Sequence, residues 1–301
     1  MTKICARKRR GREAGYALLL TLWVTAVLTL LLLTVSMRVS SNLKAAGYAT
    51  REMDAAGLAR AGFWRVAAAL RSRAEQGLDT APNGRRNESI GTWTVEPADW
   101  SAKPTEKPPE PGVAPCWCEV AVEDAKAPLS RLNAVSLGRL PTVSPTQAEA
   151  VASFLRQRAT AGGVRVLEEL WQVEGMDGAC YYGQDKTPGL AALVTPYHRG
   201  RVAINECPAE VLRVLPGVDA QLAGEIRQYL DSGRTFTRVE DLQHIPGVTP
   251  AVFQALADWV KVTPEYFRIR ATGAAGGVQR QLEGVVKVSK AGLTVLWMEG
   301  G

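Results

Sequence analysis

The chain has 301 residues, of which 46% are hydrophobic and 22% are charged, and this composition is typical of a globular protein with room for two structural units. Its formal net charge is +6, but residues 1–15 hold six basic residues and one acid, which leaves +1 for the rest of the chain. A nearly neutral body does not provide the field that sequence-independent nucleic-acid binding requires. The basic charge is therefore a property of the N-terminus.

An uncharged apolar run, Tyr16–Val35, follows the basic segment. As a helix its 20 residues would span about 30 Å, the thickness of the hydrocarbon core of a bilayer. Basic residues before a membrane span stay in the cytoplasm, so we expect the rest of the chain outside the inner membrane. The run is longer than the core of a cleaved secretory signal, and SMRVSS after it is a poor cleavage site. An uncleaved anchor and cleavage before the run are the other two interpretations.

The helix is expected to continue beyond the membrane. Residues 36–76 contain no proline and are rich in alanine, so one continuous helix over Tyr16–Gln76 is predicted. Such a helix would be about 90 Å long. In its second half, apolar residues near a 3.6-residue period predict the face that covers a soluble domain. These residues are Leu43, Ala46, Thr50, Met53, Gly57, Ala61, Trp64, Ala68 and Leu70.

After residue 77 the pattern changes from helix to strand. Two short alternating strands are predicted, with a proline-rich extended loop between them, and a long helical block follows before strands return. The strands are residues 90–97, 116–124, 266–273, 279–289 and 293–299, the loop is 97–115, and the helical block is 125–263. A sheet interrupted in this way indicates an α+β domain that carries a large inserted all-α domain.

The helical block contains an internal repeat. Residues 132–158 align with 204–230, and residues 167–176 align with 239–248, at a spacing of about 72 residues. Each copy predicts a pair of short helical hairpins, and Asn133 of the first copy corresponds to Asn205 of the second. The repeat resembles helix-hairpin-helix modules, including those of a membrane-anchored receptor for extracytoplasmic DNA, which is the alternative function.

The turns of these hairpins argue against DNA. DNA-binding hairpins use a G-x-G turn whose backbone N–H groups face a phosphate at a helix N-terminus. Gly217 and Gly247 fill the first position here, but Asp219 and Thr249 replace the second glycine. Asp219 is placed as an N-cap of the next helix, where its negative charge would repel a phosphate. We therefore expect no nucleic-acid partner.

Four cysteines follow the leader residue Cys5, an even number on the oxidising side of the membrane. Cys116 and Cys118 face the same side of a strand, where a bond between them would need severe geometry. We expect at least one of them to form a disulfide with Cys180 or Cys207 and so to join the insertion to the sheet, with the connectivity open. A zinc site is the weaker alternative because C-x₂-C spacing is lacking.

Candidate catalytic groups are scarce. His198 and His244 are the only histidines, and the sequence has no nucleophile elbow, H-E-x-x-H sequence or phosphate-binding loop. His244, in DLQHIPGV, is expected to be a packed or surface residue rather than a base. The sequence therefore predicts neither an enzyme nor a cofactor.

The N-terminus resembles the class III leaders of type IV pilins and pseudopilins, in which a short basic leader ends in Gly and an aromatic residue begins an apolar helix. Gly15 and Tyr16 occupy these positions, with Tyr in place of the usual Phe. The fifth residue after Gly15 is Leu20, where the family usually has Glu to neutralise the terminal amine of a neighbouring subunit. An unpaired charge in that apolar setting is costly, so a subunit without the Glu should not lie in the repeating body of a filament.

The K subunits of type II secretion typically lack this Glu, and the layout of the whole chain resembles the general secretion pathway protein K family. The resemblance implies that prepilin peptidase cleaves between Gly15 and Tyr16 and N-methylates Tyr16. It implies a single-pass inner-membrane protein with a periplasmic domain, at the tip of the pseudopilus, whose assembly it initiates for export of folded proteins across the outer membrane. Its partners would be the minor pseudopilins I and J, the inner-membrane assembly platform and membrane lipid.

The resemblance also assigns roles to the segments. They are a class III leader (1–15), the transmembrane (16–35) and periplasmic (36–76) parts of the N-terminal helix, the first part of the sheet domain (77–124), the inserted α-domain (125–263) and the second part of the sheet domain (264–301). Several K subunits bind calcium through an acidic loop of the insertion, but the matching residues here, 155–169, are short and basic. The family's calcium ligands therefore have no counterparts in this stretch.

Overall fold

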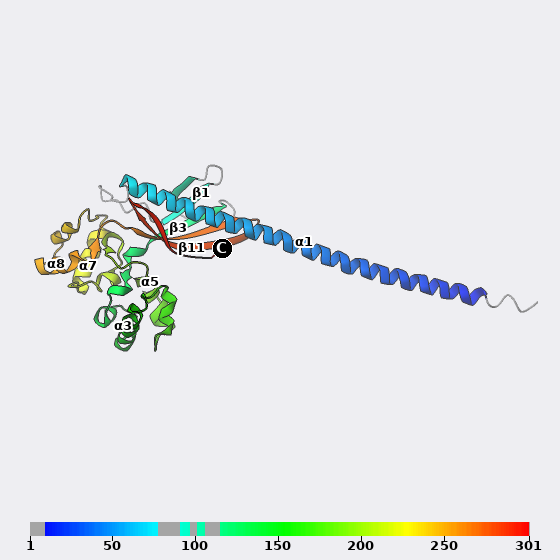
Figure 1. Ribbon diagram of the computed structural model, residues 1–301, viewed down its shortest axis with the longest axis horizontal. Coiled ribbons are helices and arrows are strands. Elements are labelled where there is room, and N and C mark those ends of the chain that lie inside the picture. The colour runs from blue at the N-terminus through cyan, green and yellow to red at the C-terminus, as the bar shows by residue number, and fades with distance from the viewer. Residues whose placement is uncertain (1–9, 78–90, 97–100, 106–114, 301) are drawn as a thin grey trace, which may run out of the picture. The chain divides into compact units, whose positions relative to one another are not determined.

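The computed structural model describes residues 10–77, 91–96, 101–105 and 115–300. They include one uninterrupted helix of 67 residues, α1 (Arg10–Gln76), as Figure 1 shows. The helix ends at the predicted residue. The chain divides into two units, Met1–Met53 and Asp54–Gly301, so that α1 contributes to both.

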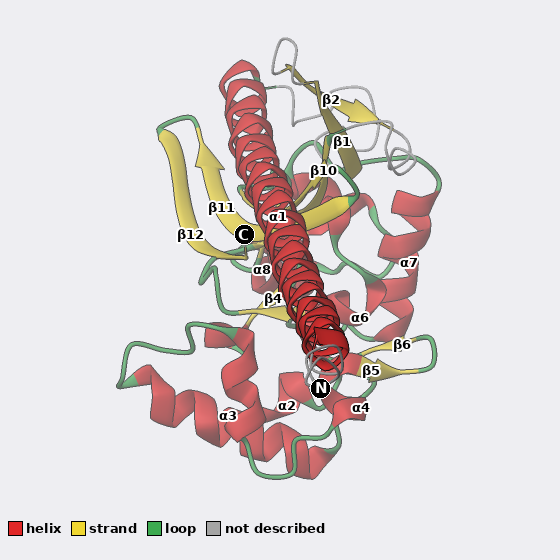
Figure 2. Ribbon diagram, turned by 90° about the vertical axis from the view of Figure 1, so that its right-hand side faces the viewer, coloured by secondary structure: helices red, strands yellow, loops and turns green. Residues whose placement is uncertain are grey.

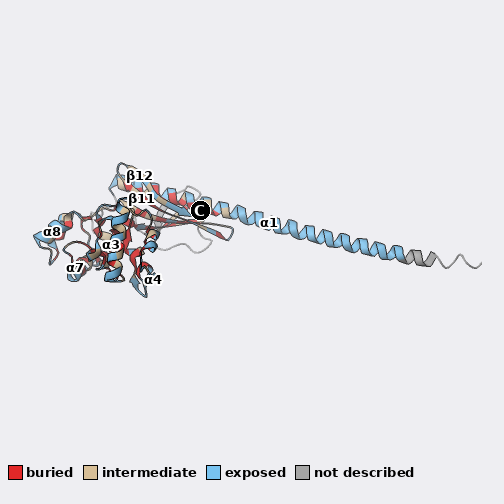
Figure 3. Cartoon of the chain, turned by 60° about the horizontal axis from the view of Figure 1, so that its bottom comes forward, coloured by how far each residue is buried: buried red, intermediate tan, exposed pale blue. Residues whose placement is uncertain are grey.

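The part of α1 in the first unit has no buried face. All residues from 16 to 51 are exposed, including Trp23 (71%) and Leu32 (67%), and Figure 3 shows this stretch in the colour of exposed residues. The part in the second unit is different, because one of its faces is completely buried. The buried residues are Ala55, Ala59, Phe63, Val66, Ala67 and Leu70, each with no exposed surface.

This buried face differs from the predicted one. Of the nine residues predicted to share a face, only Leu70 is buried, while Met53 and Trp64 are 67% and 44% exposed. The face that packs on the sheet is instead rich in alanine. Small side chains allow a helix to lie close to a sheet, and this geometric requirement overrides the position of the largest apolar residues.

Six strands form one antiparallel sheet in the order β12-β11-β10-β3-β1-β2. The strands are β1 (Gly91–Glu96), β2 (Ser101–Thr105), β3 (Cys116–Val122), β10 (Tyr266–Ala275), β11 (Val278–Ser289) and β12 (Gly292–Gly300). The expectation of an extended loop over 97–115 is wrong for β2, which pairs with β1 and places Pro104 opposite Trp93. Proline is tolerated there because β2 is an edge strand and its missing N–H has no ladder partner to lose.

Two glycines of the sheet allow α1 to approach it closely. A Cβ at Gly273 would collide with the backbone of α1 at Ala55 and Ala59. A Cβ at Gly284 would lie 2.9 Å from the Phe63 ring, where something must shift. The helix and sheet are therefore in contact through backbone at one point and through an aromatic ring at the next.

The insertion begins after β3 and ends before β10. These two strands are neighbours in the sheet, with Phe267 opposite Val122, so the sheet is continuous despite the chain that leaves between them. The helices of the insertion are α2 (Ala134–Leu137), α3 (Pro145–Ala159), α4 (Gly178–Tyr182), α5 (Leu190–Leu193), α6 (Ala209–Leu212), α7 (Ala220–Asp231) and α8 (Pro250–Ala257), with 3-10 turns η1 (Glu123–Ala125), η2 (Leu129–Arg131), η3 (Leu167–Gln172), η4 (Ile204–Glu206) and η5 (Val239–His244).

The predicted all-α character holds only in part. Three two-residue strand pairs interrupt the helices: β4 (Ala127–Pro128) with β7 (Val194–Thr195), β5 (Gly183–Gln184) with β6 (Thr187–Pro188), and β8 (Val202–Ala203) with β9 (Val260–Lys261). Figure 2 shows β4 and the β5–β6 pair in yellow among the red helices. The pairs β4–β7 and β8–β9 are parallel, and each joins the start of one copy of the repeat to its end.

The internal repeat is visible in the order of elements. The first copy runs α2, α3, η3, α4 and the second runs α6, α7, η5, α8. Both copies share one hydrophobic core, in which Leu137, Leu170, Leu212 and Leu242 have no exposed surface. A second core, containing Phe63 and the strands, lies between α1 and the sheet. The chain from Asp54 onward therefore has two cores in one compact unit.

Candidate functional site

The apolar part of α1 is the first candidate. It is long and apolar enough to cross a membrane, with a mean hydropathy of 2.5 over its most apolar 18 residues. Its threonines do not disturb this property, because their hydroxyls donate to backbone carbonyls one turn earlier at 2.8–2.9 Å. A hydroxyl with an internal partner can lie in hydrocarbon at little cost.

The predicted processing residues lie near the start of this helix. Gly15 has helical backbone, and Tyr16 and Leu20 are 78% and 65% exposed. The preceding leader residues 1–9 lie outside the described part of the chain. Nothing in the described residues covers the Leu20 side chain, so a neighbouring molecule or lipid would meet it directly.

The second candidate is a buried cluster of charges where the insertion joins the sheet. Glu123, directly after β3, is 1% exposed, and it accepts hydrogen bonds from Arg268 Nε and Nη2 at 2.7 and 2.9 Å. The Thr195 hydroxyl donates to the same carboxylate at 2.7 Å. Burial raises the pKa of Glu123, but the Arg268 hydrogen bonds and the Lys126 charge outweigh burial and hold the pKa below its usual range.

The neighbouring Asp124 makes a parallel connection. Its carboxylate lies 2.6 Å from Lys261 Nζ and accepts the backbone N–H of Glu265 at 2.9 Å. Burial lowers the pKa of Lys261, but the Asp124 and Glu265 carboxylates outweigh it and raise that pKa, which keeps the ammonium charged. Asp124 stands where the chain leaves the sheet and Lys261 where it returns. These two ion pairs therefore fasten both crossings of the insertion.

Aromatic rings cover the cluster. The Arg268 guanidinium lies 5.7 Å from the Tyr197 ring centroid and 5.8 Å from that of Trp297, and these two rings are 5.8 Å apart. Such cation–π contacts are stronger where water is excluded. Tyr197 belongs to the insertion and Trp297 to the last strand, so the rings add an apolar contact between insertion and sheet. Sequence reasoning missed this site, although the adjacent acids of VEDA directly after a strand were an available signal.

His198 is packed beside this cluster and is not placed as a base. It is 2% exposed, and its Nε2 lies 3.2 Å from the Lys126 carbonyl oxygen. A carbonyl only accepts, so Nε2 carries the hydrogen, and burial lowers the pKa of the imidazole to about 4. His198 is therefore neutral at ordinary pH. His244 lies on η5, where its Nδ1 is 3.2 Å from the Asp241 carbonyl oxygen.

The hairpin turns are the third candidate. Gly217 and Gly247 have positive φ angles of 75° and 90°, which a turn of this kind requires. The helix that follows each turn is capped by its own side chain: Asp219 accepts from the Leu222 N–H at 2.8 Å and Thr249 from the Val252 N–H at 3.3 Å. A carboxylate thus occupies the end of α7 at which a phosphate would have to bind.

The four described cysteines are free thiols and form two separate groups. Cys116 and Cys118 lie in the core between α1 and the sheet, against Gly62, whereas Cys180 and Cys207 lie in the core of the insertion. The structure thus pairs none of them, and the expected bridge between sheet and insertion is not formed in it. Burial raises the pKa of Cys180 to about 11, so its thiol is protonated and unreactive.

No metal centre is evident in the described residues, since no three His, Cys, Asp or Glu side chains among them are grouped closely enough to hold an ion. The stretch 155–169, at which the K subunits' calcium loop would align, contains the end of α3 and the start of η3. Within it, Glu169 pairs with Arg158 at 3.3 Å. That carboxylate is therefore already neutralised by a side chain of the protein.

Comparison with known proteins gives two matches. A profile described as the helix-hairpin-helix motif matches residues 198–261, which contain the second copy of the repeat. No curated protein sequence matches the chain. Among solved structures, the chain is similar to one in the crystal structure of the GspK–GspI–GspJ complex of the enterotoxigenic Escherichia coli type 2 secretion system, at 16% identity and a TM-score of 0.49, over 78% of this chain and 93% of that chain. That complex contains the K subunit, to whose family the sequence shows its resemblance.

Proposed function

We propose that this chain is a minor pseudopilin of a type II secretion system, a non-catalytic subunit at the tip of the pseudopilus that initiates pseudopilus assembly. The observation that carries the proposal is the continuity of α1. One helix is bare and apolar over its first part, then packs with an alanine-rich face on an antiparallel sheet. Such a helix anchors the subunit in the inner membrane and forms the structural support of its periplasmic domain.

Two features support a place at the tip rather than in the shaft. Leu20 cannot pair with the terminal amine of a subunit above it, so identical copies would bury that amine unpaired. The insertion adds a second hydrophobic core to the domain, and this bulk would obstruct the stacking of identical subunits. The proposed partners are accordingly the minor pseudopilins I and J, which flank the K subunit in the solved complex by its title, together with the assembly platform and membrane lipid.

Maturation by prepilin peptidase is part of the proposal, with cleavage after Gly15 and N-methylation of Tyr16. The test is N-terminal mass spectrometry of the protein extracted from membranes of cells with and without the peptidase. We expect a chain that begins at N-methyl-Tyr16 in the first case and an intact precursor in the second. Gly15→Leu should block cleavage, whereas the matched control Ala14→Ser should not. An uncleaved chain that still supports secretion would contradict the proposal.

The tip position has a separate test. The full chain in lipid nanodiscs, mixed with the minor pseudopilins I and J, should form a complex that survives size-exclusion chromatography. The major pseudopilin should not replace I and J in this complex. Immunogold labelling of assembled pseudopili should place the chain at one end. Labels repeated along the shaft would overturn this part of the proposal.

The helix-hairpin-helix match at 198–261 favours a second candidate, a membrane-anchored receptor for extracytoplasmic DNA. Against it, this region holds seven basic and eight acidic residues, and the Asp219 carboxylate caps α7. A gel shift of the full chain in nanodiscs with duplex DNA at low salt separates the two functions. Submicromolar binding that falls with added salt would favour the receptor.

A further inference from the structure

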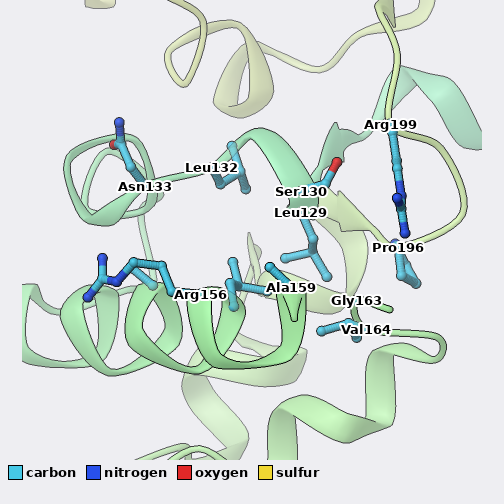
Figure 4. A pocket seen from close by; sticks show the side chains of 12 residues that line it. Leu129, Ser130, Leu132, Asn133, Arg156, Ala159, Gly163, Val164, Pro196 and Arg199 are labelled. Carbon is cyan, nitrogen blue, oxygen red and sulfur yellow. The ribbon is translucent and has the colours of Figure 1, made fainter. Parts of the chain in front are cut away.

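A pocket in the first half of the insertion is not used by the proposed function. It has a volume of about 300 Å³ and lies between α3 and the segment that contains η2 and Asn133 (Figure 4). This volume is at the lower end of the range for ligand sites. Its lining residues are Leu129, Ser130, Leu132, Asn133, Ala152, Leu155, Arg156, Ala159, Gly163, Val164, Pro196 and Arg199.

The lining combines an apolar floor with a rim of hydrogen-bond donors. Leucine, alanine, valine and proline side chains form the floor, and no acidic residue is present. Figure 4 shows Arg156 and Asn133 at one end of the space and Arg199 at the other. The two guanidinium groups therefore lie on opposite sides of the apolar surface.

These donors are largely available to a ligand. Arg156 is exposed and forms no hydrogen bond or ion pair with any described residue. Arg199 uses one N–H, which donates to the Gly162 carbonyl at 3.0 Å, and a guanidinium has five. The Asn133 oxygen accepts from the Ser136 N–H at 2.9 Å, so its amide nitrogen is left as a donor. A ligand must therefore supply acceptors at both ends and apolar groups between them.

We propose that this pocket binds a segment of a partner protein in which apolar side chains are flanked on both sides by carboxylates. One carboxylate would pair with Arg156 and the other with Arg199, while the apolar side chains fill the floor. Arginine binds carboxylates in a bidentate manner, which gives direction as well as attraction. A fatty acid satisfies only one of the two arginines, and a segment with lysines meets repulsion at both. The assignment is independent of a role in secretion.

The test uses the full chain in lipid nanodiscs and an array of octapeptides with blocked ends. In the probe set, two fixed aspartates flank two varied apolar positions, and in the matched set lysines replace the aspartates. We expect saturable binding of members of the aspartate set and none of the lysine set. Binding should weaken with salt, since the contacts at the rim are exposed charges.

Variants distinguish the pocket from general attraction. Arg156→Glu should weaken binding at least tenfold, whereas Arg213→Glu, the same change at an exposed residue outside the pocket, should leave it within twofold. Ala159→Phe fills the space without a change of charge and should also abolish binding. Because Ala159 is exposed at the end of α3, this variant should keep its unfolding temperature.

Three results would overturn the assignment. One is that no member of the aspartate set binds at millimolar concentration. Another is that Ala159→Phe binds as well as the unchanged chain while circular dichroism shows both to be folded. The third is that octanoate displaces nothing from the array but itself binds in the nanodisc sample and is lost in Ala159→Phe, which would make the pocket a lipid site.

Discussion

Replacement of Arg268 by alanine removes the cation that neutralises the buried Glu123 carboxylate. Arg268 gives three short hydrogen bonds, two to Glu123 at 2.7 and 2.9 Å and one to Glu283 at 2.7 Å. Breaking a buried ion pair by removing one partner costs about 3–5 kcal/mol, because the remaining charge stays uncompensated. Lys126 lies 3.7 Å from Glu123 and offsets part of this loss, so we expect about 3 kcal/mol.

The assay is denaturant unfolding of the full chain in detergent, followed by near-ultraviolet circular dichroism. The control is Arg270→Ala on the same strand, whose side chain is 44% exposed and contacts Glu283 at 3.0 Å and Glu119 at 3.6 Å. An exposed pair of this kind contributes at most about 1 kcal/mol. Equal losses of unfolding free energy in the two variants would refute the argument that burial makes the Glu123 contact strong.

The same variant has a pH signature. In the unchanged protein the folded pKa of Glu123 lies below its unfolded value, so the stabilisation is present above the unfolded pKa and is lost as the pH falls through the folded pKa. Without Arg268, burial dominates and the carboxyl takes up a proton more readily. The difference in unfolding free energy between Arg268→Ala and the unchanged chain should therefore shrink on acidification. A difference that is constant with pH would contradict the assigned role.

Three further predictions concern packing, titration and the repeat. Gly273→Ala should lower the unfolding free energy by about 1–3 kcal/mol through overpacking, whereas Gly57→Ala, whose Cβ meets nothing within 4 Å, should raise it by about 0.5–1 kcal/mol; the reverse order in thermal unfolding would contradict the close helix–sheet contact. The pKa of His198 is lowered by burial from 6.5 to about 4, so stability is complete above pH 6.5 and falls by about 3 kcal/mol between pH 6.5 and 4; His198→Gln should flatten this slope, and an unchanged slope would argue against a buried neutral imidazole. Asn205→Ala removes three hydrogen bonds to backbone groups and should cost about 2–3 kcal/mol, whereas Asn133→Ala loses a helix cap worth about 1 kcal/mol; equal costs by urea unfolding would mean that the two residues play equivalent roles.

The pair Asn133 and Asn205 shows how far the sequence repeat could be read. Alignment places the two residues at the same position of their copies, and the order of helices in the structure agrees with the repeat. Their contacts differ, because Asn133 caps α2 whereas Asn205 binds backbone groups of Phe236 and Val262. Residues 31 and 57 positions away in the chain supply these partners, and no local pattern contains them.

The buried face of α1 was outside the reach of periodicity for a similar reason. A 3.6-residue period fits more than one face of an alanine-rich helix, and the large Trp64 favoured the wrong one. The sheet selects the face with Ala55, Ala59 and Gly62, because only small residues allow the backbone contact at Gly273. The edge strand β2 was missed because its proline suggested a loop, although an edge position tolerates proline.

What the sequence determined by itself is local and repetitive: the uncharged run of membrane length, the uninterrupted helix to Gln76, the interrupted sheet and the duplicated hairpins. Each follows from side-chain periodicity, from the absence of proline or from self-similarity along the chain. Only the tertiary structure decided which face of α1 is buried, that Glu123 pairs with Arg268 across the insertion, and that two arginines face each other over an apolar pocket. These features depend on groups far apart in the chain, and the fold must bring them together before their distances, burial and charges can act.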